Sequence, residues 1–284
     1  LILIVMISLL FVTGVYAFNP TIQHLLNADA GLKEANSNGL EHPLGLEQIA
    51  QGVKVTLDWA YADENRIAIA YTIVSENGNQ YEPKDFTLTN SAGQSFPATT
   101  GMADFSQGEG GYVFSFDASS ITNNSQNLDL HLNLWLDSKE SKELVEPISF
   151  SFQVPFTPGR NADLEQHYTA EGILITLEKV VVTPSDLTAV ICFKGPNEYY
   201  KWTPISHIDI KNGENSVRAT NGSLTNPDEN GCTTNHYFPS LYTHDGIWSL
   251  TVTELVGTNP DYPESDKPHQ QRIPGLWIFE FELP

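Results

Sequence analysis

The sequence predicts an all-β protein in which two consecutive antiparallel β-sandwiches follow an N-terminal apolar helix. Short runs of alternating apolar and polar residues recur along the chain, and clusters of Asn, Ser, Gly and Pro separate them. Such alternation is typical of strands that bury one face and are joined by turns. A chain of 284 residues also has room for two domains of about 100 to 150 residues, each with its own core.

The same hairpin pattern occurs twice. The stretch GVKVTLDWAYADENRIAIAYTI at residues 52–73 aligns without a gap with GILITLEKVVVTPSDLTAVICF at residues 172–193. The closing strands recur as well, as ISFSFQVP at residues 148–155 and WIFEFELP at residues 277–284. Each long stretch is typical of a strand, a turn and a return strand, so the repeat marks the start of each of two domains.

Alternation also predicts which side chains share a face. In the first strand the apolar residues expected on one face are Val53, Val55, Leu57 and Trp59. No segment after residue 50 has the pattern of a long helix. The chain divides into five predicted segments, which are a transmembrane helix at 1–18, a juxtamembrane helical segment at 19–45, a first β-sandwich at 46–156, a linker at 157–162 and a second β-sandwich at 163–284.

The first eighteen residues, LILIVMISLLFVTGVYAF, contain no charged side chain. As a helix they extend about 27 Å, close to the thickness of a bilayer's hydrocarbon layer. No Lys or Arg precedes Lys33, so we expect a single-pass bacterial membrane protein whose residues after about 18 lie outside the cytoplasm. The alternative is a cleaved signal peptide and a secreted protein, because Val15-Tyr16-Ala17 has the small residues of a cleavage site. The first residue is not Met, which suggests that the sequence continues upstream.

A short helix is expected directly after this segment. Pro20 suits the first turn of a helix, and Asn38-Gly39 suits its C-terminal cap. The apolar residues on one side of this helix are Ile22, Leu25, Leu26 and Leu32.

The run from the apolar N-terminal segment through GLEHPL (39–44), GVKVTL (52–57) and DENRIAIAYTI (63–73) resembles the bacterial domain-of-unknown-function family 4179. The resemblance covers roughly residues 1–155. It implies a membrane protein seen as the extracytoplasmic part of membrane-anchored anti-sigma factors, followed by an immunoglobulin-like domain. The expected architecture is thus two immunoglobulin-like sandwiches. A sigma factor would be a partner only through a cytoplasmic part, commonly a helical domain with a zinc site, that is not among these residues.

Catalytic signatures are missing from the sequence. It has no Gly-x-Ser-x-Gly elbow, phosphate loop or His-Glu-x-x-His motif, so we expect a non-enzymatic protein with no catalytic, cofactor-binding or metal-binding residues. The Gly108–Gly111 stretch is expected to be a turn rather than a phosphate cradle. With 14 Lys and Arg against 35 Asp and Glu, the net charge of -21 repels phosphate backbones, which excludes nucleic acid as a partner.

An acidic loop at 226–231 places oxygen-bearing side chains before a Gly, as in a calcium loop. Tyr237 occupies the position of the bidentate Glu, so an EF-hand is rejected and a hairpin loop is favoured. The alternative is an irregular calcium site that uses Asp261, Glu264 or Asp266.

Cys192 and Cys232 form a possible disulfide, because an even pair of cysteines oxidises outside the cytoplasm. A buried free thiol is the competing interpretation of Cys192. The aromatic run Tyr199 to Trp202 is either a platform for a sugar ring or, more often in proteins, a strand whose rings alternate between core and surface.

These features leave two hypotheses. The first is a sensory or regulatory ectodomain that binds an envelope protein or glycan. The second is a passive cell-surface spacer or adhesion module without a signalling role. The sequence does not identify ligand-binding residues for either.

Overall fold

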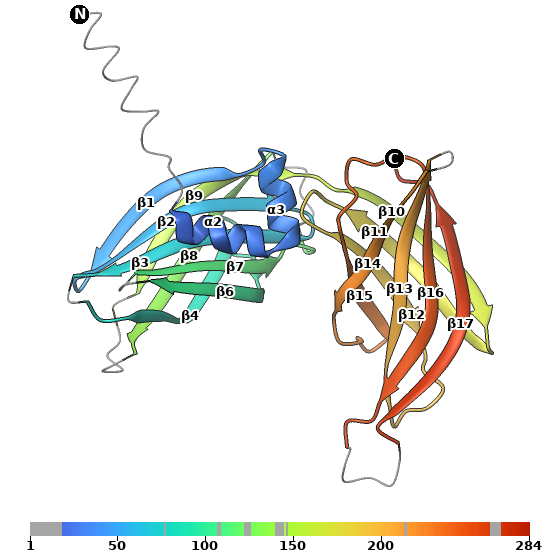
Figure 1. Ribbon diagram of the computed structural model, residues 1–284. Helices are drawn as coiled ribbons and strands as arrows, with labels where there is room; N and C mark the ends of the chain where they lie inside the picture. Colours follow the sequence, from blue (N-terminus) through green and yellow to red (C-terminus); the bar gives the residue numbers. More distant parts are fainter. Residues whose placement is uncertain are drawn as a thin grey trace, which may run out of the picture. The chain divides into compact units, whose positions relative to one another are not determined.

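The computed structural model describes residues 19–76, 78–106, 109–121, 126–139, 145, 147–212, 215–261 and 268–284, and these form two compact units (Figure 1). Unit 1 comprises Leu1–Thr157 and unit 2 comprises Pro158–Pro284. The transmembrane helix expected at 1–18 lies outside the described residues. Within the described ranges, no helix is long and apolar enough to cross a membrane.

The described residues of unit 1 form two short helices and nine strands. Its elements are α2 (Pro20–Ala28), α3 (Ala30–Ser37), β1 (His42–Ala50), β2 (Val53–Asp63), β3 (Arg66–Ser75), β4 (Tyr81–Asn90), β5 (Ser95–Phe96), β6 (Ala98–Ser106), β7 (Glu109–Asp117), β8 (Asn127–Ser138) and β9 (Ile148–Thr157). The strand order is β5-β4-β8-β9-β2-β3-β7-β6, with β1 paired to β2. The β2–β9 pairing is parallel and only two residue pairs long. Side chains from both sides of this junction share one core, so the sheet folds over on itself there.

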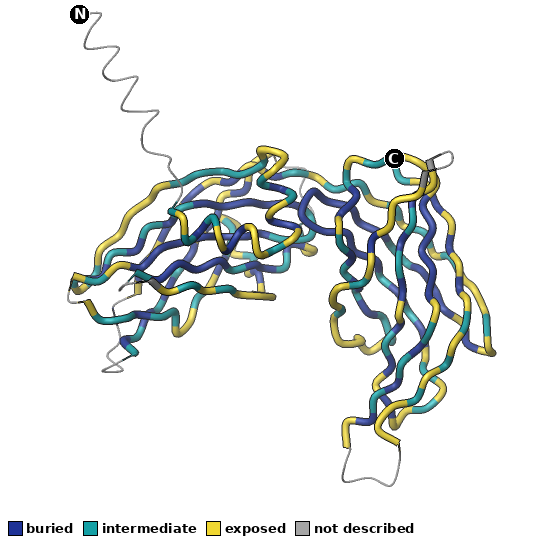
Figure 2. The backbone as a smooth tube through the Cα atoms, in the orientation of Figure 1, coloured by how far each residue is buried: buried dark blue, intermediate teal, exposed yellow. Residues whose placement is uncertain are grey.

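The helices cover the opposite face of β2, β3 and β7 (Figures 1 and 2). The predicted helix exists but is divided into α2 and α3 at Asp29, whose side chain caps α3 by accepting a hydrogen bond from the Leu32 N–H. The apolar side of both helices is buried, as predicted, against Trp59, Tyr61, Ala68, Ala70 and Val113.

A β-bulge makes this second buried face possible and corrects one prediction. Leu57 pairs with Tyr71 and Trp59 pairs with Ala70, so Asp58 is an extra residue in β2. A bulge reverses the alternation of a strand beyond it. Trp59 therefore does not share the face of Leu57 but lies under the helices, where it is fully buried.

The described residues of unit 2 form eight strands in one antiparallel sheet. They are β10 (Arg160–Ala170), β11 (Ile173–Val182), β12 (Leu187–Phe193), β13 (Lys201–Asn212), β14 (Asn215–Leu224), β15 (Cys232–Phe238), β16 (Ile247–Thr258) and β17 (Gln270–Phe281), in the order β10-β11-β12-β15-β14-β13-β16-β17. The Gln166 side-chain amide donates to the Glu280 carbonyl, at 2.9 Å, so the two edge strands approach each other around one core.

The all-β class is confirmed, whereas the immunoglobulin-like sandwich is not. The strands of unit 2 form one continuous ladder, while an immunoglobulin domain has two separate sheets. Alternation indicates which face of a strand is buried but not which strands become neighbours, so the sequence could not distinguish these arrangements.

Three predicted boundaries also need correction. The juxtamembrane segment was expected to reach residue 45, but β1 begins at His42. The linker expected at 157–162 is shorter, because β9 ends at Thr157 and β10 begins at Arg160. The predicted turn at Gly108–Gly111 belongs in part to β7, which begins at Glu109.

The repeat seen in the sequence is also a structural repeat. In unit 1 the β1–β2–β3 block pairs Leu46 with Leu57 and Leu57 with Tyr71; in unit 2 the β10–β11–β12 block makes the same pairings 120 positions later. Both blocks skip one residue at the same place, Asp58 in β2 and Glu178 in β11. The two units therefore share a three-stranded block with the same register and the same bulge.

Candidate functional site

Each three-stranded block carries a row of polar residues on the face opposite its core. In unit 1 the row crosses the strands through Glu47, Thr56, Thr72 and Gly111, which are successive cross-strand partners. In unit 2 the partners at the first three equivalent positions are His167, Thr176 and Cys192, and Cys192 pairs in turn with Cys232. The two rows occupy the same place in the repeat but have different surroundings.

In unit 1 the start of α2 covers the end of the row formed by Thr72 and Gly111. The Asn19 side chain caps α2 by accepting from the Thr21 N–H, at 2.9 Å. Its amide nitrogen donates to Thr72 Oγ1, at 3.4 Å, and to Glu109 Oε1. A Cβ atom on Gly111 would lie 2.6 Å from Thr21 Cγ2, so this glycine allows α2 to lie close to β7. The residue that joins α2 to the preceding segment is thus fixed to the sheet.

The bulge residue Asp58 extends this network. The Thr72 hydroxyl donates to Asp58 Oδ2, at 2.7 Å. Burial raises the pKa of Asp58 to about 6; the bond from Thr72 opposes this rise, and the charges of Glu109 and Glu47 add to it. The charge of Lys54 also opposes the rise in the pKa of Asp58. The ammonium group of Lys54 itself forms an ion pair with Glu47, at 3.1 Å.

A second anchor ties the helix pair to β3. Arg66 forms a bidentate ion pair with Asp29, with both N–O distances 2.9 Å and little exposure of either side chain. Burial opposes ionisation of Asp29, but the hydrogen bonds and charge of Arg66 outweigh it and hold the pKa of Asp29 below its ordinary value. The side chain of His24 is exposed, and its Nδ1 lies 3.2 Å from Asp104 Oδ2.

In unit 2 no described helix covers the equivalent row. Cys192 and Cys232 lie directly opposite each other on β12 and β15 and form a disulfide. Of the two interpretations of Cys192, the structure contains the disulfide rather than a buried thiol, and both cysteines are half-buried. His167 Nδ1 lies 2.8 Å from Thr176 Oγ1, so an imidazole, a hydroxyl and the disulfide succeed one another across four strands.

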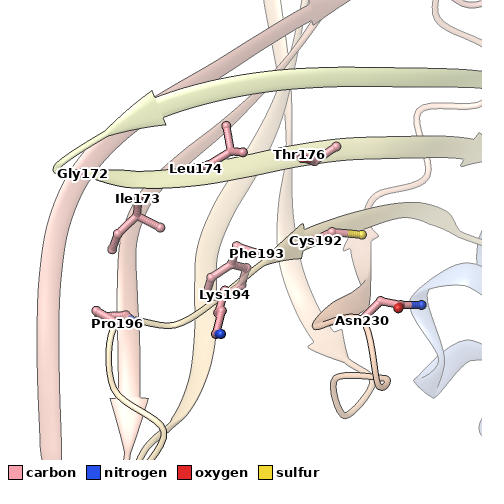
Figure 3. A pocket seen from close by; sticks show the side chains of 9 residues that line it. All are labelled: Gly172, Ile173, Leu174, Thr176, Cys192, Phe193, Lys194, Pro196 and Asn230. Carbon is pink, nitrogen blue, oxygen red and sulfur yellow. The ribbon is translucent and has the colours of Figure 1, made fainter.

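Two adjoining pockets open beside the disulfide. The first has a volume of about 440 Å³ and includes Cys192 and Thr176 in its wall (Figure 3). The second has a volume of about 680 Å³ and is bounded by the segment after β12 and by the loop at 226–231. Phe193, Lys194 and Asn230 line both. The wider pocket also presents Glu198, so cationic and anionic side chains occur together at its rim.

The loop at 226–231 is a closed turn. Asp228 Oδ1 accepts the backbone N–H groups of Asn230 and Cys232, at 2.9 and 2.8 Å, and the Phe193 N–H donates to the Gly231 carbonyl. Gly231 has a positive φ of 79°, and a Cβ atom there would lie 2.6 Å from the Phe193 oxygen. The loop thus requires glycine at this position and uses the Asp228 carboxylate to bind its own backbone.

The alternative calcium site gains no support from the described residues. In the ranges that the structure describes, His, Cys, Asp and Glu form no group of three or more that could hold a metal ion. Glu264 and Asp266 lie outside the described residues, and the loop's own Asp228 oxygen is occupied by backbone donors.

The aromatic run is mainly structural. The Trp202 indole N–H donates to the Asn197 carbonyl, at 2.9 Å. A Cβ atom on Gly195 would lie 2.1 Å from the Trp202 ring, and one on Gly257 would lie 3.0 Å from it, so backbone packs directly against the indole. Tyr199 is 57% exposed, whereas the buried Tyr200 donates its hydroxyl to the Pro268 carbonyl. The ring of Trp202 is therefore not free to stack on a sugar.

Known proteins resemble this chain in part of its sequence and in its fold. Residues 1–75 match the family model described as Domain of unknown function (DUF4179), and that range ends with β3, the last strand of the first block. The crystal structure of the conserved domain protein from Bacillus anthracis is similar, with a TM-score of 0.65 and 13% identity over 88% of this chain and 93% of that chain. At this identity the likeness shows the fold alone.

Two further solved structures are much less similar. A DUF4426 family protein from Pseudomonas aeruginosa has a TM-score of 0.30 and 12% identity over 38% of this chain and 96% of that chain. The N-terminal periplasmic domain of ScsB from Proteus mirabilis has a TM-score of 0.23 and 10% identity over 86% of this chain and 99% of that chain. Among curated proteins, no sequence matches the chain.

Proposed function

We propose, from the match of residues 1–75 to the DUF4179 family, that this chain is a non-enzymatic extracytoplasmic protein anchored in the bacterial membrane by residues 1–18. Its role in this proposal is that of the sensory or regulatory ectodomain of an anti-sigma-factor-like protein. Unit 2 binds an envelope component or partner protein through the pockets beside its disulfide. A sigma factor is bound only by a cytoplasmic part of the whole protein.

The observation that carries the proposal is the attachment of α2 to the sheet of unit 1. Residue 19 directly follows the predicted anchor, and its side chain bonds both Thr72 and Glu109. The apolar side of α2 is buried on the same face of the sheet. A passive spacer needs only a covalent link to its anchor, whereas this attachment lets a change in the sheet alter the position of the anchor.

The pockets of unit 2 suit a binding role. They combine apolar surface from Phe193 and Ile173 with the charged groups of Lys194 and Glu198. Binding sites commonly have this composition, an apolar wall with a few polar groups that fix orientation. The rim contains both charge signs, which favours a peptide or an amino-substituted glycan over a simple anion.

The proposal is tested by releasing α2 from the sheet in cells. Leu26→Asp places a carboxylate in the fully buried contact between α2 and the sheet, whereas Lys33→Asp makes the corresponding change on the exposed side of α3. We expect Leu26→Asp, at wild-type protein abundance, to change the abundance of transcripts under one sigma factor, and Lys33→Asp to leave them unchanged. A transcriptome that is identical in both variants and the wild type would refute regulation and favour the passive spacer.

The location is tested separately. In intact cells, external protease should digest units 1 and 2 while a cytoplasmic marker protein survives. Digestion only after lysis would refute the extracytoplasmic location.

A further inference from the structure

The disulfide of unit 2 lies on the surface of the sheet rather than in its core. Ile191 and Phe193, its neighbours along β12, point into the core and are buried, whereas Cys192 points to the opposite face and is half-buried. Cys192 also forms part of the wall of the 440 Å³ pocket (Figure 3). A reagent that enters this pocket therefore reaches the bond without opening the core.

A difference between the two blocks makes the face that carries Cys192 accessible in unit 2. In unit 1 the equivalent pair, Thr72 and Gly111, lies against the start of α2, and Thr72 is only 5% exposed. Among the described residues of unit 2 there is no such helix. The residue after the bulge differs accordingly, because Trp59 lies under the helices of unit 1 while Lys179 takes its place in unit 2.

One cationic side chain shares the pocket with Cys192. Lys194 lines the same pocket as Cys192, and a nearby ammonium group stabilises both an attacking and a departing thiolate. On the other side of Cys192, Thr176 contacts the His167 imidazole, at 2.8 Å. One carboxylate oxygen of Asp228 accepts the backbone N–H groups of Asn230 and Cys232, and these two donors offset its negative charge.

The disulfide also holds the wall of the wider pocket. It joins the end of β12 to the start of β15, where the loop at 226–231 ends. Without it, the start of β15 is held to β12 by the antiparallel ladder between the two strands, and the end of the loop is held by the hydrogen bond from the Phe193 N–H to the Gly231 carbonyl, at 3.3 Å. Breaking the covalent bond therefore loosens the loop that encloses the pocket.

We propose that Cys192–Cys232 is a thiol–disulfide exchange site, at which an external dithiol protein or small dithiol controls the shape of the neighbouring pocket. A thiolate of the dithiol attacks one cysteine sulfur, the S–S bond breaks, and the other cysteine leaves as a thiolate that takes a proton from water. The second thiol of the dithiol then attacks the mixed disulfide and releases the first cysteine. The dithiol becomes a disulfide, and the protein gains two electrons as two thiols. This site can operate in a regulatory ectodomain and in a passive spacer alike.

Dithiothreitol is the probe for the exchange step. The oxidised full-length protein is mixed with increasing dithiothreitol under native conditions, quenched with iodoacetamide and analysed by mass spectrometry. We expect a reduction rate proportional to dithiothreitol concentration and within about tenfold of the rate in denaturant, because attack needs no unfolding. A rate that becomes independent of dithiothreitol concentration means that unfolding limits reduction, and this overturns the proposal.

Lysine variants test the local chemistry. Lys194→Gln should slow reduction about three- to tenfold, whereas Lys194→Arg should keep the wild-type rate, because only the charge is needed. Lys211→Gln removes an exposed lysine at the end of β13 and is the matched control. Equal rates for Lys194→Gln and Lys211→Gln would overturn the role assigned to Lys194.

Trp202, in the wall of the wider pocket, reports the consequence of reduction. Its fluorescence, isolated by subtracting the spectrum of Trp202→Phe, should change on reduction while the far-ultraviolet circular dichroism stays constant. The Cys192→Ser/Cys232→Ser variant should already show the reduced signal and not respond to dithiothreitol. An unchanged Trp202 signal would overturn the control of pocket shape.

Discussion

Replacing Asp58 by Asn should make unit 1 more stable at neutral pH and remove part of its pH dependence. Asp58 is the bulge residue of β2, and it accepts a hydrogen bond from Thr72, at 2.7 Å, beside Glu109 and Glu47. Burial is the largest cause that raises its pKa, from 3.8 to about 6. Asn keeps the size and an oxygen acceptor but carries no charge, so it imitates the protonated carboxyl group.

The sign of the effect follows from the direction of this pKa change. The folded state binds the proton more tightly than the unfolded state, so the stabilisation is fully present below pH 3.8 and is lost as the pH rises through about 6. The difference between the two pKa values corresponds to about 3 kcal/mol, and solvent screening of this partly buried group reduces it to about 1–2 kcal/mol. We therefore expect Asp58→Asn to raise the free energy of unfolding of unit 1 at pH 7 by about 1–2 kcal/mol.

Calorimetric unfolding of the full chain between pH 4 and pH 8 measures this effect, with Asp129→Asn as a control for an exposed carboxylate in the same unit. The wild type and the control should lose stability in parallel as the pH rises, while Asp58→Asn should lose less. A carboxyl ¹³C titration should place the midpoint of Asp58 near 6. A midpoint near 4, or parallel stability curves for all three proteins, would refute the reasoning.

Three further substitutions probe the same contacts. Arg66→Ala leaves the Asp29 carboxylate without its bidentate partner and should lower the free energy of unfolding of unit 1 by about 2–4 kcal/mol in urea denaturation, with Arg66→Lys intermediate. Gly111→Ala should force α2 away from β7, which amide hydrogen exchange detects as faster exchange in α2 but not in β8. Replacing both Cys192 and Cys232 by Ser should lower the stability of unit 2 by about 3–4 kcal/mol, since the cysteines are 40 positions apart; an unchanged melting temperature would contradict this.

The alternation of the sequence predicted the hairpins at 52–73 and 172–193 and the closing strands, each of which buries an apolar face, but it missed the half-exposed strands β1 and β10. The strand β10 has no fully buried residue, and β1 is exposed along most of its length. Both are aligned by the strand that follows them, so their extended form comes from pairing rather than from a hydrophobic pattern of their own. Edge strands of this kind give little signal in a single sequence.

The candidate site was only partly visible in the sequence. Aligning the repeats placed Thr72 opposite Cys192, and the structure assigns both to equivalent rows. Thr72 pairs with Gly111 on β7, and Cys192 pairs with Cys232 on β15. These two strands come at different places in the succession of strands along the two units, so the alignment did not relate them. The ion pair between Asp29 and Arg66 joins residues 37 positions apart and has no sequence signature.

The sequence by itself determined the all-β class, the helical segment before the sheet, the resemblance to the DUF4179 family and the repeated hairpin, because each depends on local periodicity and turn residues. Only the tertiary structure decided that a bulge at Asp58 turns Trp59 toward the helices, and that the same bulge recurs at Glu178. The physical reason is that a bulge exists only relative to the partner strand. One extra residue turns every later side chain of the strand to the opposite face, and the alternation within a single strand does not show which residue is left unpaired.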